Sequence, residues 1–81
     1  MTQQQTQDSK EHLSVYQHHQ KAAEHHGHAA KHHGEAARHH EAGDYKAAAH
    51  HAHVAHGHTL LAIEHSNEAS KQHATKHGDV K

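Results

Sequence analysis

Residues 18–40 read HHQKAAEHHGHAAKHHGEAARHH, and the pattern of this stretch decides the fold. A histidine pair recurs every seven residues, at 18/19, 25/26, 32/33 and 39/40, and an alanine pair follows at 22/23, 29/30 and 36/37. Seven residues make two turns of an α-helix, so each member of a pair returns to the same side. The repeat therefore predicts a long helix whose contact face is built from imidazoles and methyl groups.

Helix geometry places the two members of each histidine pair on different parts of this face. At 3.5 residues per turn, the second histidine lies about 105° from the first and falls between the two alanines. We therefore expect the second histidines to form the innermost column of the first helix, with the first histidines along one flank. The expected inner column is His19, His26, His33 and His40.

The second half of the chain continues the same spacing. Histidines at 51, 58 and 65 are again seven residues apart, and alanine or aliphatic residues recur three or four positions away from them. This spacing is typical of a second helix with one apolar stripe. We predict a single domain over residues 1–81, with helices at 9–42 and 45–76, a turn at 43–44, and mobile ends at 1–7 and 78–81.

Local sequence signals support these limits. Asp8, with Glu11 three residues later, has the spacing of a helix-starting capping box. Gly43 suits the left-handed position that ends a helix, and Asp44 can cap the helix that follows. Because so short a connection makes the helices antiparallel neighbours, the predicted fold class is all-α, an antiparallel helical hairpin.

Within this hairpin we expect large residues to face small ones, as His33 faces Val54 and His58 faces Ala29. Imidazoles would then alternate between the helices at steps of three or four residues, which is roughly 5 Å along the axis. The expected order along the seam is His40, His51, His33, His58, His26, His65 and His19.

A buried imidazole needs a partner, because an unpaired buried polar group costs about 1–3 kcal/mol. The expected column must therefore be satisfied by metal, by water, by other side chains or by contact with solvent. A single hairpin with an alanine seam would leave much of the column open. Two hairpins would bring columns from four helices near one axis, so we expect a homodimer that forms a four-helix bundle.

The composition excludes several classes of protein. The 81 residues include no cysteine, proline, phenylalanine or tryptophan, and the formal net charge is −1 with neutral histidines. Disulfide frameworks and thiolate metal sites are therefore excluded. The balanced charge predicts no nucleic-acid partner, and no apolar run approaches the roughly 20 residues of a membrane span. We see no signal peptide, and so expect a cytoplasmic protein.

Eighteen histidines in one small chain point to transition-metal chemistry. Neutral imidazole is a good ligand for zinc, copper(II) and nickel, and the chain offers it repeatedly instead of in one unique cluster. The sequence thus predicts a metal-binding protein that buffers, stores or transports Zn, Cu(II) or Ni. The candidate ligands are His19, His25, His26, His28, His32, His33, His40, His51, His58 and His65.

The sequence leaves other interpretations open. A catalytic zinc site needs three fixed ligands in a shaped cavity, and neither His-Glu-x-x-His nor Glu-x-x-His occurs, so we expect no enzyme. A pH-responsive structural or interaction protein with no dedicated metal role is the alternative function, because histidine titrates near pH 6.5. The imidazoles could also simply fill space beside alanine.

Two features carry a resemblance to a known group. They are the repeated HHxxAA blocks and the turn Glu41-Ala-Gly-Asp-Tyr45, which is followed by Ala47-Ala-Ala-His-His51. Across most of residues 18–65 the chain resembles small, histidine-rich, uncharacterised bacterial helical proteins. The resemblance implies a helical fold and metal handling.

Overall fold

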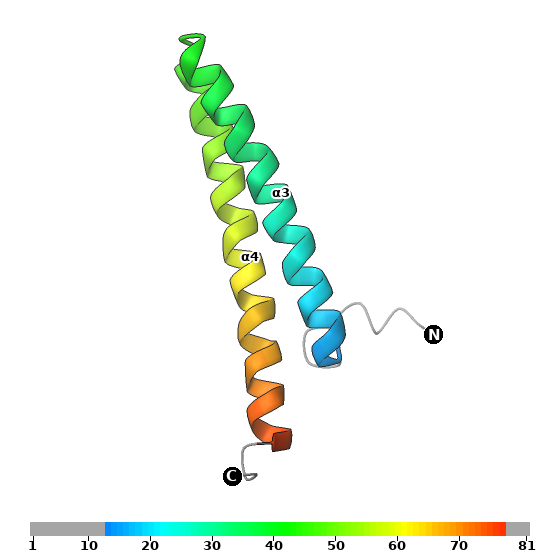
Figure 1. Ribbon diagram of the computed structural model, residues 1–81. Helices are drawn as coiled ribbons and strands as arrows, with labels where there is room; N and C mark the ends of the chain where they lie inside the picture. Colours follow the sequence, from blue (N-terminus) through cyan, green and yellow to red (C-terminus); the bar gives the residue numbers. More distant parts are fainter. Residues whose placement is uncertain (1–12, 78–81) are drawn as a thin grey trace, which may run out of the picture.

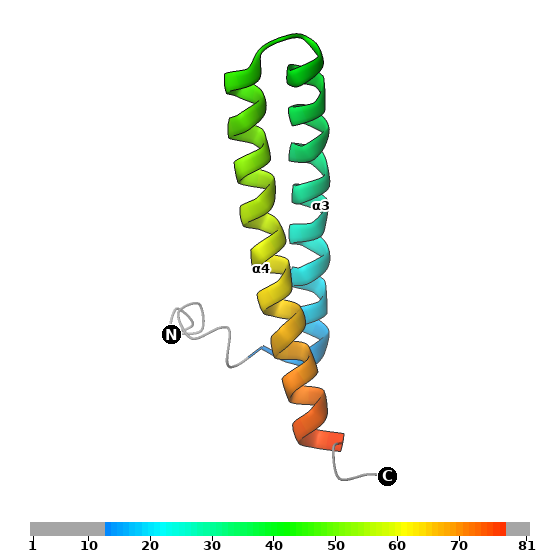
Figure 2. The same cartoon turned by 90° about the vertical axis from the view of Figure 1, so that its left-hand side faces the viewer.

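The computed structural model describes residues 13–77, which form two helices. These are α3 (Val15–Glu41) and α4 (Tyr45–His77). They run antiparallel and lie side by side in both ribbon views, and the last turns of α4 extend beyond the start of α3 (Figure 1, Figure 2). Because the described residues contain no strand, the predicted all-helical hairpin is confirmed.

The first helix begins later than predicted. Ser14 is its N-cap: the Ser14 hydroxyl accepts a hydrogen bond from the Gln17 amide at 3.1 Å, and the Gln17 side chain accepts one from the Ser14 amide at 2.9 Å. This capping box satisfies amides that lack a partner within the helix, and so fixes the start. Leu13 and Ser14, expected inside the helix, therefore precede it. The capping box expected at residues 8 and 11 lies outside the described residues.

The turn between the helices follows the predicted chemistry. Gly43 has φ +86°, the left-handed conformation expected there. The amide of Asp44 bonds to the His39 carbonyl at 2.8 Å and that of Gly43 to the His40 carbonyl at 3.0 Å, which is a Schellman motif. The Asp44 carboxylate then accepts a bond from the Ala47 amide at 3.2 Å and caps α4. The turn thus reverses the chain within three residues and sets the helix register.

The core between the helices is made of very small side chains. Ala55 and Ala62 are fully buried, and no large aliphatic residue joins them among the described residues. The buried alanines present only methyl groups, so these positions let the helices approach closely. Toward the open end of the hairpin, the Gln72 side chain donates a 2.7 Å hydrogen bond to the Leu13 carbonyl and ties α4 to the entry of α3. The buried alanines are Ala22, Ala29, Ala48, Ala55, Ala62 and Ala69.

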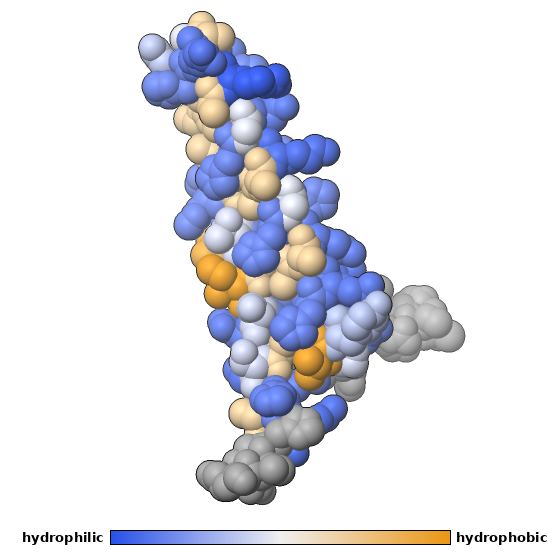
Figure 3. Space-filling view, in the orientation of Figure 1, coloured by the Kyte–Doolittle hydropathy of each residue, from blue (hydrophilic) through white to orange (hydrophobic). Residues whose placement is uncertain are grey.

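The larger apolar side chains lie on the outside. Leu60, Leu61 and Ile63 are 40–49% exposed, and the tyrosines at 16 and 45 are more exposed still. In the view of Figure 3 the surface is mainly hydrophilic, and the strongly apolar residues form small, separate patches. Neither helix in the described part of the chain is long and apolar enough to cross a bilayer.

Candidate metal centre

Three histidine pairs bridge the two helices at heptad intervals. The Nδ1 atoms of His18 and His65 lie 2.9 Å apart, and the next two pairs follow at 3.0 and 3.1 Å. We call each pair a rung, because one imidazole comes from each helix and the two nitrogens meet across the seam. The three rungs are His18–His65, His25–His58 and His32–His51.

Ring stacking joins the rungs into a continuous column. His65 stacks on His25 and His58 on His32, both with centroids 5.9 Å apart. His39 extends the column beyond the last rung by stacking on His51 at 5.3 Å with an interplanar angle of 4°. Seven imidazoles therefore alternate between the helices. This imidazole ladder runs His18, His65, His25, His58, His32, His51 and His39.

Each rung requires two different tautomers. A hydrogen bond between two Nδ1 atoms needs one of them to carry the proton and the other to present its lone pair. One imidazole of every rung is therefore the Nδ1–H form, whose Nε2 is a lone-pair donor suited to a metal ion. The other imidazole carries its proton on Nε2. A rung can keep its hydrogen bond with one extra proton but loses it with two.

The ring nitrogens that meet in the rungs have hydrogen-bond partners within the ladder itself. His18 is fully buried, and the other ladder imidazoles are half-buried. No buried side-chain nitrogen or oxygen in the described residues lacks a hydrogen-bond partner. Of the ways to satisfy a buried imidazole that the sequence allowed, the folded chain uses other side chains, namely further imidazoles. A metal ion would thus compete with bonds whose net worth is about 1 kcal/mol each.

The prediction for the first helix was wrong by one residue. The ladder takes the first histidine of each pair from α3, whereas the expected inner column of second histidines is exposed. The prediction for α4 is confirmed, because His51, His58 and His65 all lie in the seam. The members of the expected inner column, all left outside the ladder, are His19, His26, His33 and His40, of which His40 packs on Tyr45 with centroids 4.8 Å apart.

The alanines explain this shift. Ala22 and Ala29, the first alanine of each pair, are buried, whereas Ala23 and Ala30, the second, are exposed. A first histidine lies four residues before such an alanine and so shares its side of α3, where its ring meets the equivalent ring from α4, whereas a second histidine lies about 100° further round the helix. Large residues thus face large ones and small face small, in contrast to the expected alternation.

On α3, the position three residues after each of the three rung histidines varies in residue type. This position holds Lys21 beside the first rung, His28 beside the second and Glu35 beside the third. The ring of His28 lies 4.9 Å from that of His58, so this candidate ligand reaches the seam, although we had not expected it in the seam order. The three rungs therefore differ in charge and in ligand supply although their histidine pairs are equivalent.

A three-residue cluster occupies the turn end of the ladder. Glu35, His39 and His51 each offer a ligand atom, and these atoms all lie within 4.8 Å of one another. The Glu35 carboxylate is 3.9 Å from Nε2 of His39, while Nδ1 of the same ring is 3.9 Å from the Asp44 carboxylate. Arg38 also hydrogen-bonds to Glu35.

Sequence reasoning missed three residues of this arrangement. His18 and His39 were expected on the flank with the other first histidines, and none of His18, His39 and Glu35 was among the candidate ligands. The Glu35–His39 spacing of four residues was a usable signal, because such residues neighbour each other on a helix. The approach of His51 from the other helix had no local signal, since it depends on the hairpin register.

The pKa values of two groups of the site, His25 and Glu35, are lowered from their ordinary values. Burial, reinforced by the nearby imidazoles of His58 and His28, lowers the pKa of His25 below its ordinary 6.5. The hydrogen bond from Arg38 lowers the pKa of Glu35 and keeps this carboxylate ionised. Both effects favour the unprotonated forms that bind metal.

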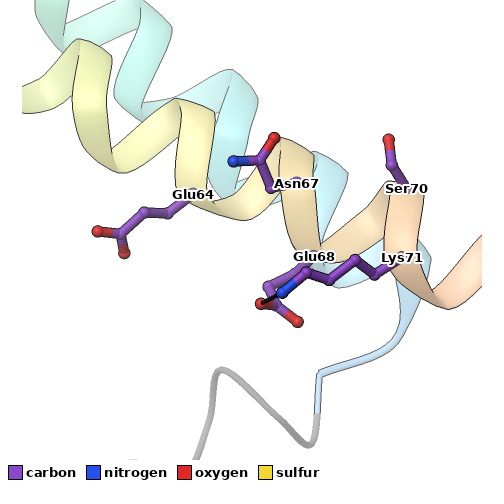
Figure 4. Close-up of a pocket in the computed structure, with 5 residues that line it drawn as sticks. All are labelled: Glu64, Asn67, Glu68, Ser70 and Lys71. Carbon is purple, nitrogen blue, oxygen red and sulfur yellow. Dashed lines mark hydrogen bonds and ion pairs between the residues drawn. The ribbon is translucent and has the colours of Figure 1, made fainter.

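A surface hollow on α4 offers much less chemistry (Figure 4). Its lining residues all belong to this one helix, and Lys71 already pairs with Glu68 at 3.3 Å. The Glu64 side chain points away from that pair (Figure 4). The lining residues are Glu64, Asn67, Glu68, Ser70 and Lys71.

Comparisons with protein families, with curated proteins and with solved structures gave no match. The fold and site define an antiparallel helical hairpin with an imidazole seam, and its function is inferred from that chemistry.

Proposed function

We propose that this protein binds transition-metal ions reversibly through the imidazole ladder, and so buffers, stores or transports zinc, copper(II) or nickel. The observation that carries the proposal is the rung, in which two nitrogens from different helices face each other at 2.9–3.1 Å. Two nitrogen ligands on one ion, with bonds of about 2.0–2.1 Å, are separated by roughly 3 Å. Neutral imidazole suits these three metals.

The repetition of the ladder favours exchange over a single permanent site. Its rungs recur every seven residues, about 10.5 Å along the helix, so ions on different rungs would repel each other only weakly. Apart from His18, the ladder imidazoles are half-buried, which leaves them accessible to incoming ions. Several similar, accessible positions suit a protein that takes up and releases metal.

The test is a metal titration of two matched variants after treatment with chelator. In the inner variant, His18, His25, His32 and His39 become Gln; in the outer variant, His19, His26, His33 and His40 become Gln. Both lose four imidazoles, so composition alone predicts equal losses of capacity. The proposal predicts that the outer variant keeps most of its affinity for Zn, Cu(II) or Ni and the inner variant loses it.

A second readout covers the case in which the inner variant fails to fold. Histidine ring signals of the unaltered protein are followed by NMR during the titration. Early changes confined to ladder histidines support the proposal. Equal changes in all histidines, or binding too weak to survive dialysis, contradict it.

A pH-responsive structural role is the second candidate, favoured by the rung chemistry itself. Two Nδ1 protons cannot share one rung, so full protonation in mild acid breaks the contacts between the helices. This role predicts acid-induced dissociation or melting that chelated and metal-loaded protein share, with no metal selectivity.

We also propose that two hairpins associate into a four-helix bundle. Support comes from the small alanine core and from the exposed side chains of Leu60, Leu61 and Ile63, because small cores commonly need oligomerisation. Sedimentation equilibrium should give a dimer, and Ile63→Lys should shift it toward monomer. A monomer at all concentrations contradicts this proposal.

A further inference from the structure

We infer that the turn end of the ladder is its tightest metal site, where Glu35, His39 and His51 bind one zinc-type divalent cation. This inference rests on the proposed function and ranks the positions within it. Two imidazoles and one carboxylate are a ligand set used for four-coordinate zinc, with the fourth position left to water. The ligand atoms of this cluster come from both helices and all lie within 4.8 Å of one another.

Each of the two histidine ligands has an outer partner that can orient it. The Asp44 carboxylate, 3.9 Å from Nδ1 of His39, favours a proton on that nitrogen and leaves Nε2 toward Glu35. On the other helix, Nδ1 of His51 faces Nδ1 of His32 at 3.1 Å. If His51 donates in this rung, its Nε2 lone pair serves the ion. Carboxylate or other acceptors behind a ligating histidine are a regular feature of metal sites.

The residue three positions after each rung histidine of α3 ranks the rungs by their expected affinity for a divalent cation. Glu35 brings a negative charge to the turn end, His28 brings a neutral ligand to the middle, and Lys21 brings a positive charge to the open end. Attraction of a divalent cation should therefore fall from the turn toward the open end. The site at the turn also links the end of α3 to the start of α4, where Gly43 and Asp44 already fix the register.

Titration with Co²⁺, whose visible absorption reports four-coordinate binding, followed by displacement with Zn²⁺ tests this ranking. Glu35→Gln is compared with Glu24→Gln, an exposed glutamate of the same helix that pairs with Lys21 at 3.9 Å. We expect Glu35→Gln to weaken the first equivalent at least about tenfold, and Glu24→Gln to leave it unchanged. Asp44→Asn, which keeps a capping side chain, should weaken it less.

The outcomes separate this inference from the proposed function. If Glu35→Gln binds the first ion as tightly as the unaltered protein while total capacity is kept, the ladder binds metal but the turn site is not its tightest position. If the first equivalent of Zn²⁺ shifts the ring signals of His25 and His58 before those of His39 and His51, the ranking is also wrong. If the unaltered protein binds none of the metals, the proposed function itself fails.

Discussion

The Nδ1 atoms of His25 and His58 lie 3.0 Å apart across the seam, and their rings stack with centroids separated by 5.2 Å. The same pair of rings therefore packs the two helices together and gives each Nδ1 atom a hydrogen-bond partner. Because alanines provide nearly all of the remaining core, such rungs supply the bulky part of the interface. The same two nitrogens are the atoms that protons and metal ions compete for.

Removing one member of a rung should cost more than removing an outer histidine. His58→Ala leaves Nδ1 of His25 without its partner, and the free energy of unfolding should fall by about 1–3 kcal/mol. His53→Ala removes an exposed imidazole from the same helix and serves as the control. Urea unfolding in the presence of chelator, followed by circular dichroism, measures both. Equal stability of the two variants would show that the rung contributes nothing.

Stability should rise with pH across the range in which histidine titrates. The pKa of His25 is lowered in the folded state, so the unfolded chain binds more protons between that lowered value and 6.5. The contribution is complete above pH 6.5 and is lost as pH falls through this window. The imidazoles of His58 and His28 and the ammonium of Lys21 oppose protonation, while Glu24 favours it.

Thermal melts of the chelated protein from pH 5 to 8 measure this dependence. His25→Gln should flatten the profile, whereas His26→Gln, which alters the exposed neighbour, should not. A melting temperature independent of pH in the unaltered protein would contradict the prediction.

Arg38 should act as a competitor for the metal at the turn end. It hydrogen-bonds to Glu35, and an ion must displace it or share the carboxylate. Arg38→Gln should therefore increase the affinity for the first Co²⁺ a few-fold, and the pKa of Glu35 should rise toward its usual value. Lys31→Gln removes one positive charge seven residues earlier and serves as the control. It distinguishes the loss of Arg38 as a competitor for Glu35 from the change in net charge. An equal gain in both variants would assign the effect to charge alone.

Two glycines should respond to alanine in opposite ways. A Cβ at Gly27 would meet nothing within 4 Å, so Gly27→Ala should raise the free energy of unfolding by roughly 0.5–1 kcal/mol through helix propensity. Gly43 has φ +86°, and Gly43→Ala should cost about 1–2 kcal/mol. Thermal melts of both variants test the pair. A loss of stability in Gly27→Ala would mean that this face is covered by another chain.

Much of the fold could be predicted because its signals are local. The turn chemistry of Gly43 and Asp44 needs only neighbouring residues, and the seven-residue spacing needs only the helix repeat. The start of α3 was harder, since Ser14 with Gln17 and Asp8 with Glu11 have the same capping-box spacing. We predicted the start from Asp8 and Glu11, whereas Ser14 and Gln17 cap α3 in the structure.

The candidate site depended on which histidine of each pair lies in the seam. Histidines at 18 and 19 both lie on the side of α3 that carries the alanines, and the repeat led us to expect the second of them in the seam. The choice depends on which alanine of each pair packs against α4, which is a property of the two helices together. Glu35 became a candidate ligand for the same reason, because His51 reaches it only across the hairpin.

The sequence by itself determined two helices, one turn and a seam of imidazole and alanine, because helix periodicity and capping act within a few residues along the chain. Only the tertiary structure decided which histidine of each pair faces its partner and which carboxylate joins them. The physical reason is that the alanine of each pair that packs in the seam also brings the first histidine there, because the two lie four residues apart on one side of the helix.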